Sequence, residues 1–191
     1  MQGETMRGTA ILETERLYLR CMDDHDFQSL CLIMQDEETM YAYEGAFSDE
    51  EVYAWLERQK NRYEKDGFGL WAVCLKENDE MIGQCGITLQ NINGTIGPEI
   101  GYLFQKAYWH QGYASEAAIG CREYAFGELK LPGICSIIRD TNLASQNVAK
   151  RNGMTIKEQF VKHYRDVDML HYVYKITCDE WKQLKTENTK E

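Results

Sequence analysis

Residues 99–117 join a strand-like run to a short loop and the start of a helix. The run Pro98–Phe104 (PEIGYLF) precedes the loop, and Gly112 and the small Ala114 stand where the helix should begin. A helix that begins there points unpaired backbone N–H groups, and the positive end of its dipole, into the space beyond the strand. Glycine takes a positive φ and lets an anion approach the backbone closely. The segment therefore favours binding of a pyrophosphate.

A second segment of interest, Asp140–Met154, follows the next strand-like run. Asn142 suits the N-cap of a helix, and Asn152-Gly153 suits its C-terminal end. The two segments stand ~30 residues apart, the separation that one parallel crossover requires. Mixed sheets of this kind place ligands at the carboxyl ends of their parallel strands.

The elements that must position these residues begin with a β-then-α pattern and an antiparallel meander. Ser48 and Glu51 form a capping-box pattern that marks the start of a helix. The elements expected in this half are a strand at about Arg16–Met22, a helical stretch to about Met34, a helix at about Ser48–Lys65, and strands at Gly69–Leu75, Met81–Gln90 and Pro98–Phe104.

The second half alternates helices and strands, which is the signature of parallel β-α-β connections. We therefore expect an α/β fold with a mixed antiparallel and parallel sheet. The elements expected here are a helix at about Ala114–Lys130, a strand near Cys135–Asp140, a helix at about Asn142–Arg151, and strands at about Thr155–Lys162 and Met169–Ile176.

The length of 191 residues and the absence of repeats or linkers predict a single domain over residues 1–191. We expect its core at about residues 14–176, with loose ends at residues 1–14 and after about Leu184. No apolar run reaches the ~18–20 residues of a membrane helix, and the first residues lack a secretory signal. A cytoplasmic protein is expected.

The net charge and the spacing of possible metal ligands limit which partners and cofactors the protein is expected to bind. The formal charge of -10 argues against nucleic acid or an anionic membrane as partner and favours a cationic substrate. Seven cysteines without a Cys-x-x-Cys pair are interpreted as reduced core thiols, and the four histidines show no metal-ligand spacing. We expect no metal.

The two segments together resemble the GNAT superfamily of acetyltransferases. Glu-Ile-Gly-Tyr, Tyr-Trp and Gly-Tyr-Ala-x-Glu-Ala are similar to its acetyl-CoA motif, [Gln/Arg]-x-x-Gly-x-[Gly/Ala], as used by the branch of ribosomal-protein N-terminal alanine acetyltransferases. The opening ERLYLR and the segment Asn-x-x-Ser-x-x-Val-x-x-x-x-Gly are also similar, so the resemblance covers about residues 14–176. The sequence departs at Trp109, in the Gln/Arg position, and at His110, where a further glycine is common.

The resemblance implies the GNAT fold, a central mixed and twisted sheet with helices on both faces, and acetyl-CoA as the co-substrate. His110 either donates to the phosphate or faces solvent, and we favour solvent. The positions that match cofactor-binding residues are Tyr102, Leu103, Phe104, His110, Gln111, Gly112, Tyr113, Ala114, Ser115, Asn142 and Ser145.

The implied reaction is direct attack of an amine on the thioester, without an acyl-enzyme. Freeing a lysine-like amine of its proton at pH 7 costs roughly 4–5 kcal/mol, so a base is needed. Glu99 matches the family's strand glutamate in that role, and a backbone N–H near Leu103 would stabilise the oxyanion. Ser145 is the matched acid for the leaving thiolate, with Tyr102, Tyr113 and Tyr164 as alternatives.

The acceptor site is expected to draw on aromatic and acidic residues in Met40–Phe47 and His163–Asp168, with Tyr43, Glu44 and Trp71 the first to test. A protein N-terminus, a polyamine and an amino sugar all remain open as acceptors. Assembly into a homodimer also remains open. A catalytically silent CoA-binding module is the main alternative. An ATP-binding protein is disfavoured, because the loop lacks the Gly-x-x-x-x-Gly-Lys pattern.

Overall fold

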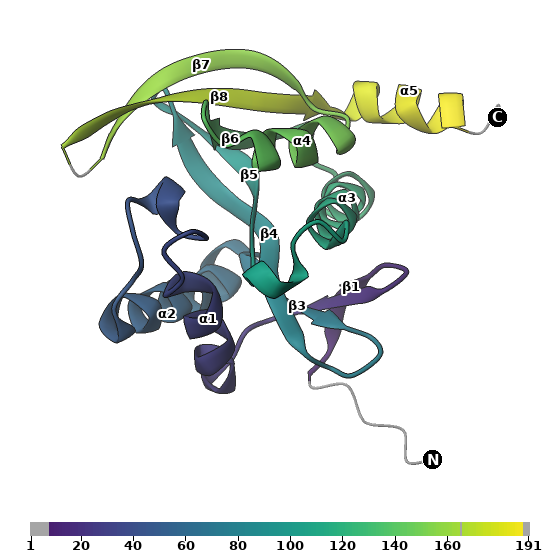
Figure 1. The fold of residues 1–191 in the computed structure, drawn as a ribbon. Coiled ribbons are helices and arrows are strands. Elements are labelled where there is room, and N and C mark those ends of the chain that lie inside the picture. The colour runs from purple at the N-terminus through teal and green to yellow at the C-terminus, as the bar shows by residue number, and fades with distance from the viewer. Residues whose placement is uncertain (1–7, 165, 189–191) are drawn as a thin grey trace. The chain divides into compact units, whose positions relative to one another are not determined.

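The computed structural model describes residues 8–164 and 166–188, which contain eight strands of one mixed sheet and five α-helices (Figure 1). The strands lie in the order β1-β2-β3-β4-β5-β6-β8-β7. Their bounds are β1 Ala10–Glu13, β2 Leu17–Arg20, β3 Leu70–Leu75, β4 Met81–Ile92, β5 Thr95–Phe104, β6 Gly133–Arg139, β7 Thr155–Tyr164 and β8 Val167–Thr177. The helices are α1 Phe27–Met34, α2 Asp49–Asp66, α3 Tyr113–Gly127, α4 Leu143–Arg151 and α5 Cys178–Asn188.

Strand directions confirm the expected mixed sheet. The pairs β1/β2, β2/β3 and β3/β4 are antiparallel, as are β6/β8 and β7/β8. Strand β6 runs parallel to β5, with Glu99 opposite Cys135. Helix α3 therefore lies in the crossover between two parallel strands, as the alternation of elements indicated.

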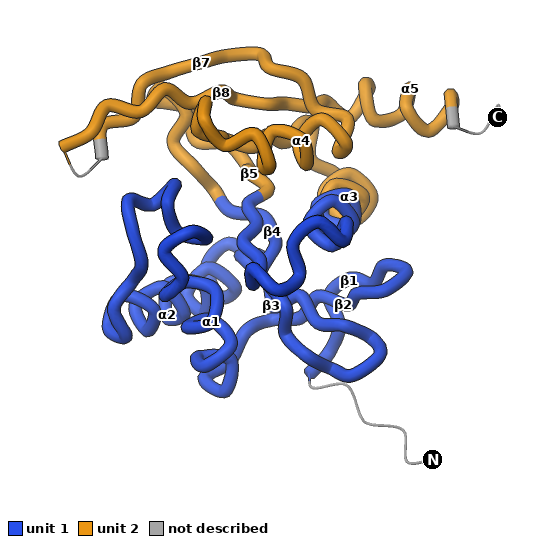
Figure 2. The backbone as a smooth tube through the Cα atoms, viewed as in Figure 1, with its two compact units in different colours: residues 1–88, 101–121 blue, residues 89–100, 122–191 orange. Residues whose placement is uncertain are grey.

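Backbone contacts gather into two compact units, which are described separately (Figure 2). Unit 1 comprises residues 1–88 and 101–121, and unit 2 comprises residues 89–100 and 122–191. Strands β4 and β5 and helix α3 each contribute residues to both. The expectation of a single domain stays a prediction.

Unit 1 buries strand β2 completely and packs α1 against α2. Its core includes Leu30 and Ile33 of α1, Leu56 of α2 and Tyr18 of β2. Helix α2 begins with the expected capping box, in which Ser48 accepts from the Glu51 amide and Glu51 accepts from the Ser48 amide. The start of this helix was therefore readable from the sequence alone.

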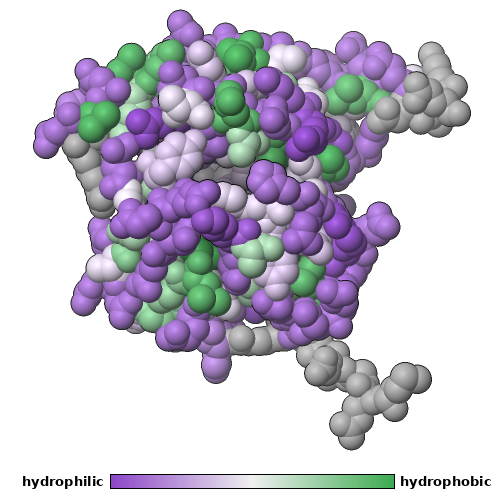
Figure 3. Space-filling model, in the orientation of Figure 1, coloured by the Kyte–Doolittle hydropathy of each residue, from purple (hydrophilic) through white to green (hydrophobic). Residues whose placement is uncertain are grey.

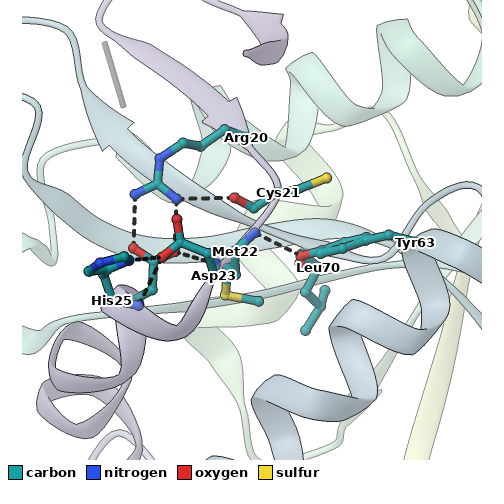
Figure 4. Close-up of polar contacts among 8 residues, drawn as sticks. Arg20, Cys21, Met22, Asp23, His25, Tyr63 and Leu70 are labelled. Carbon is teal, nitrogen blue, oxygen red and sulfur yellow. Dashed lines mark hydrogen bonds and ion pairs between the residues drawn. The ribbon is translucent and has the colours of Figure 1, made fainter. Parts of the chain in front are cut away.

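A buried ion pair ties β2 to the entry of α1 (Figure 4). The guanidinium of Arg20 donates to both carboxylate oxygens of Asp26 at 2.8 Å, and the two side chains are only 3% and 1% exposed. Nearby, the hydroxyl of Tyr63 on α2 donates to the Leu70 carbonyl and accepts from the Met22 amide. Burial raises the pKa of Tyr63, so the hydroxyl remains a donor.

Unit 2 packs α4 against β6 and carries a small core of Ile92, Cys135 and Val173. Asn142 is the N-cap of α4, as its position indicated, and its side chain accepts from the Ser145 amide. At the other end of α4, Gly153 takes a φ of 77°, which confirms the expected stop.

Within the described residues, part of each end that was expected to be loose forms regular structure, whereas residues 1–7 and 189–191 lie outside the described residues. Residues 10–13 form β1, because its backbone pairs with β2 and the Leu12 side chain lies over Gly120. Residues 178–188 form α5, in which Trp181 packs on Phe126 with ring centroids 5.2 Å apart. Thr177 and Glu180 supply a capping box that the sequence analysis missed.

Exposed apolar side chains come from several separate elements. The largest fractions belong to Leu32 on α1, Ile96 on β5, Leu143 on α4 and Val161 on β7. On the face drawn in Figure 3, apolar residues are interspersed with polar ones. None of the helices in the described ranges combines the length and apolar character needed to cross a membrane.

The buried ion pair generates a stability prediction. Replacing Arg20 by Met leaves the Asp26 carboxylate buried without its bidentate partner, and we expect a loss of about 3–5 kcal/mol in the free energy of unfolding, measured in urea. The matched control is Lys60→Met, which removes the more exposed ion pair with Asp24 and should change stability little. Equal effects of the two variants would contradict the structural role of the Arg20 pair.

Candidate functional site

The loop of residues 105–112 joins β5 to α3 within unit 1 and is held by its own hydrogen bonds. It contains a single 3-10 turn, Lys106–Tyr108. The indole N–H of Trp109 donates to the Phe104 carbonyl at 2.9 Å, and the Gln111 side chain donates to the Ala107 carbonyl at 3.1 Å. Trp109, which departs from the family motif, therefore braces the loop against the end of β5.

The loop backbone is left-handed at two positions, His110 with a φ of 61° and Gly112 with a φ of 85°. The glycine was expected to take this conformation, which costs other residues strain. His110 stands where related sequences often have glycine, and its φ gives the reason. His110 is exposed, which agrees with the expectation that it faces solvent.

Helix α3 begins directly after this turn. The amide of Glu116 donates to the Gly112 carbonyl at 3.0 Å, so Gly112 is the residue that caps the helix. The amides of Tyr113, Ala114 and Ser115 precede that first intrahelical bond and cannot pair within the helix. Gly112 is exposed, and a Cβ there would come 3.4 Å from Nη2 of Arg16. An exposed glycine beside a cation and a helix N-terminus fits a phosphate group.

A polar cluster that sequence reasoning missed holds the start of α3. The carboxylate of Glu116 accepts from the Thr14 hydroxyl at 2.6 Å, the Arg16 amide at 2.8 Å and Nε of Arg16 at 2.7 Å. Burial favours a raised pKa for Glu116, but these bonds outweigh it and hold the pKa below its usual range. The only sequence signal was that Arg16 lies in ERLYLR and Glu116 lies in Gly-Tyr-Ala-x-Glu, two segments that resemble the family.

Arg16 also reaches the loop itself. Its Nη1 donates to the Gln111 carbonyl at 3.1 Å, and its guanidinium carbon lies 4.2 Å from the centre of the Tyr113 ring. Tyr113 in turn meets the Tyr108 ring edge to face. A hydrogen bond to Glu80, together with burial, raises the pKa of Tyr108 to about 12. Tyr108 is therefore protonated at neutral pH.

The end of β5 carries three of the expected cofactor-binding residues. Tyr102 is half-buried, and Leu103 packs against the core of unit 1. Phe104 is only 5% exposed, because its ring lies against Gly83 of β4. Phe104 can therefore offer a ligand its backbone but not its side chain.

Glu99, the expected base, lies in unit 2 on β5 and reaches the neighbouring strand. Its Oε1 accepts from the Ile137 amide at 3.0 Å, and the Ser136 hydroxyl donates to the Ile100 carbonyl at 2.8 Å. Two side chains thus join β5 to β6 beyond their backbone pairing. The carboxylate of Glu99 is half-buried and fixed in direction by this bond.

The second motif folds as a helix start in unit 2. Ser145 is half-buried in the first turn of α4, and its amide donates to Asn142 at 3.0 Å. The side chain of Gln146 donates to the Asp140 carbonyl and accepts from the Tyr174 hydroxyl. Asn142 therefore has a structural task of its own. The side chain of Tyr164, an alternative acid, lies outside the described residues.

The residues expected near the acceptor differ in burial. Tyr43 packs edge to face with Phe47 and Trp55, and Glu44 follows it with a φ of 61°. Both are half-buried. Trp71 is 1% exposed, so its ring belongs to the core and an acceptor cannot contact it in this structure.

The expected site residues thus fall into separate groups. Unit 1 brings together Tyr102, Leu103, Phe104, His110, Gln111, Gly112, Tyr113, Ala114 and Ser115 along β5, the loop and α3, and it also contains Tyr43, Glu44 and Trp71. Unit 2 contains Glu99 on β5 and Asn142 and Ser145 at α4.

Comparisons with known proteins point to one family. The acetyltransferase (GNAT) domain matches residues 16–155. The uncharacterized N-acetyltransferase YnaD of Bacillus subtilis (strain 168) is 31% identical over 173 residues, covering 89% of this chain and 98% of the relative. The crystal structure of a GNAT-family acetyltransferase from Bacillus anthracis has a TM-score of 0.77 at 25% identity, covering 88% of this chain and 98% of that chain.

A further solved structure is a ribosomal L7/L12 alpha-N-protein acetyltransferase in complex with coenzyme A. Its TM-score is 0.72 at 18% identity, with 90% of this chain and 99% of that chain covered. At that identity the likeness shows a shared fold alone.

For the two left-handed residues, we predict changes in the free energy of unfolding that have opposite signs. Gly112→Ala forces a Cβ into a φ of 85° and should lower the free energy of unfolding by about 1–2 kcal/mol. His110→Gly relieves strain at a φ of 61° and should leave stability equal or higher by up to about 1 kcal/mol. Thermal unfolding measures both, and His110→Ala, which keeps the Cβ, is the control. A stabilised Gly112→Ala variant would show that the turn does not need its glycine.

Proposed function

This chain belongs to the GNAT acetyltransferase family, and from that membership we propose that it transfers the acetyl group of acetyl-CoA to a primary amine of a small molecule or a protein N-terminus. The observation that carries the proposal is the exposed, left-handed Gly112 at the N-terminus of α3. It stands at the glycine of the family's cofactor motif. GNAT enzymes use acetyl-CoA, whose diphosphate needs such a site.

The loop and the start of α3 supply the binding groups. Backbone amides at a helix N-terminus bind phosphate through hydrogen bonds and the helix dipole. The amides of Tyr113, Ala114 and Ser115 are assigned this role, with the turn at His110 and Gly112 shaping the approach. The backbone of Tyr102, Leu103 and Phe104 is assigned to the pantetheine arm and acetyl group.

Glu99 is assigned as the proton acceptor for the substrate amine. A protonated amine has no lone pair for attack, and removing the proton of a lysine-like amine at pH 7 costs roughly 4–5 kcal/mol. The bond from the Ile137 amide to Oε1 fixes the carboxylate in one orientation. A base held by a second group gains in positioning over one on a free side chain.

The bond changes require one more proton transfer. The amine nitrogen forms a bond to the acetyl carbon, the carbon–sulfur bond breaks, and the CoA thiolate takes up a proton. We assign the backbone N–H near Leu103 to the carbonyl oxygen and the Ser145 hydroxyl to the thiolate. The ammonium nitrogen loses two protons. The first leaves through Glu99 before the attack, and the second, lost once the carbon–nitrogen bond has formed, replaces the proton that Ser145 gives to the thiolate.

The acceptor is proposed by class alone. Tyr43 belongs to an aromatic group with Phe47 and Trp55, and Glu44 adds a carboxylate beside it. Aromatic faces and carboxylates both attract a cationic amine. A protein N-terminus, a polyamine and an amino sugar all carry such an amine. Trp71 is left out because it is buried.

A catalytically silent CoA-binding module is the second candidate. The observation that favours it is that Glu99 and Asn142 both have structural bonds, to Ile137 and Ser145, which a module without turnover would also keep. Binding of acetyl-CoA without acceptor-dependent thiol release would distinguish it.

The test compares wild type with Glu99→Gln in thiol release from acetyl-CoA, using N-terminal peptides, polyamines and aminoglycosides as acceptors. Glutamine keeps an oxygen that accepts from the Ile137 amide but loses the negative charge. We expect kcat/KM at pH 7 to fall ~10²-fold or more. The deficit should shrink as pH rises toward the pKa of the acceptor amine, about 8 for a peptide N-terminus and about 10.4 for a lysine-like amine, because the substrate then no longer needs a base.

The matched control is Glu128→Gln, which removes an exposed carboxylate of the same unit and should leave kcat/KM unchanged. A deficit in Glu99→Gln that persists unchanged at high pH would count against the base assignment. If no acceptor stimulates release although acetyl-CoA binds, the silent module is the better account. Failure to bind acetyl-CoA at all would refute the proposed function.

A further inference from the structure

Glu116 places a carboxylate in the first turn of α3, next to the amides assigned to the diphosphate. A negative charge there attracts the helix N-terminus but repels an incoming phosphate. The side chain is 17% exposed, so water screens it only in part. An enzyme that binds a diphosphate at this turn needs a reason to keep an acid in it.

The turn between β1 and β2 neutralises and saturates this carboxylate. Oε1 accepts from the Thr14 hydroxyl and the Arg16 amide, and Oε2 accepts from Nε of Arg16. All three donor–acceptor distances lie between 2.6 and 2.8 Å. The Arg16 side chain is 42% exposed, so its charge is available to more than Glu116.

The rest of the guanidinium spans the loop. Nη1 binds the Gln111 carbonyl, which turns that oxygen, the negative end of a peptide dipole, toward a cation. The guanidinium carbon lies over the Tyr113 ring, and Nη2 lies beside Gly112. Arg16 therefore contacts the residues on both sides of Gly112 as well as Glu116.

We propose that Arg16 is a positioning residue for the diphosphate of acetyl-CoA, acting by holding the 111–113 backbone and cancelling the charge of Glu116. The inference rests on the proposed function and deepens it. This role requires the planar, forked guanidinium of arginine, because it contacts the Glu116 carboxylate, the Gln111 carbonyl and the Tyr113 ring at the same time. Removing Arg16 frees the loop and exposes the phosphate to an unbalanced carboxylate.

The experiment measures the dissociation constant of CoA by calorimetry at low and high salt for Arg16→Met, Glu116→Gln and the double variant. We expect Arg16→Met to weaken CoA about tenfold or more, with a larger loss at low salt where charge repulsion is less screened. The double variant should bind CoA more tightly than Arg16→Met, because the repelling charge is gone. The control is Lys60→Met, which removes a cation of the same unit that is paired with Asp24 and Glu57 and should leave CoA binding unchanged.

A second readout uses acetyl-pantetheine, which lacks the diphosphate. We expect Arg16→Met to lower kcat/KM for acetyl-CoA about tenfold while kcat/KM for acetyl-pantetheine stays within about twofold. Equal losses with both thioesters, or a double variant no better than Arg16→Met, would overturn the proposal and leave Arg16 a merely structural residue.

A fallback variant and two outcomes distinguish failure of this inference from failure of the proposed function. If Arg16→Met does not fold, Arg16→Lys keeps the charge but loses the fork, and a several-fold loss confined to acetyl-CoA is expected. Unchanged CoA binding in the Arg16 variants, with wild type binding normally, overturns this inference alone. A wild type that does not bind CoA overturns the proposed function instead.

Discussion

The carboxylate of Glu116 is the constraint on which the arrangement of unit 1 around the loop depends. It gathers three donors from the turn between β1 and β2, 100 or more residues away in sequence. Because its own helix begins at Gly112, fixing the carboxylate also fixes the direction of the helix start. The amides assigned to the diphosphate inherit their orientation from that one group. Thr14 and Arg16, which are remote from the loop in sequence, thus contribute to its geometry.

The two arginines of the ERLYLR segment illustrate different uses of an ion pair. Arg20 is buried with Asp26, where a bidentate pair satisfies both charges but offers nothing to a ligand. Arg16 is partly exposed, pairs with Glu116 and still reaches the loop carbonyl and the Tyr113 ring. The difference lies in their surroundings: strand β2 is enclosed by the core at Arg20, whereas Arg16 precedes it at the surface.

In unit 2 the same polar groups hold the fold and are assigned to chemistry. Glu99 joins β5 to β6 by accepting from Ile137, and Asn142 caps α4 by accepting from Ser145. These bonds restrict the movement of the assigned groups in the folded protein. The entropic cost of orienting the groups is therefore not incurred when the substrate binds. A base and an acid on such supports are placed before the substrate arrives. This is the physical reason why a structural bond is compatible with the proposed catalytic roles at these positions.

Local patterns allowed the sequence by itself to determine the family, the mixed sheet and several exact element boundaries. The capping box at Ser48, the cap at Asn142 and the left-handed Gly112 each depend on a few consecutive residues, so short-range hydrogen bonding and φ preference decide them. Tertiary structure decided the rest. Strand β1 pairs with the neighbouring β2 and its Leu12 lies over Gly120, while helix α5 packs the half-buried Trp181 on Phe126. The Arg16–Glu116 contact and the burial of Trp71 likewise join residues far apart in the chain, and no local pattern carries that information.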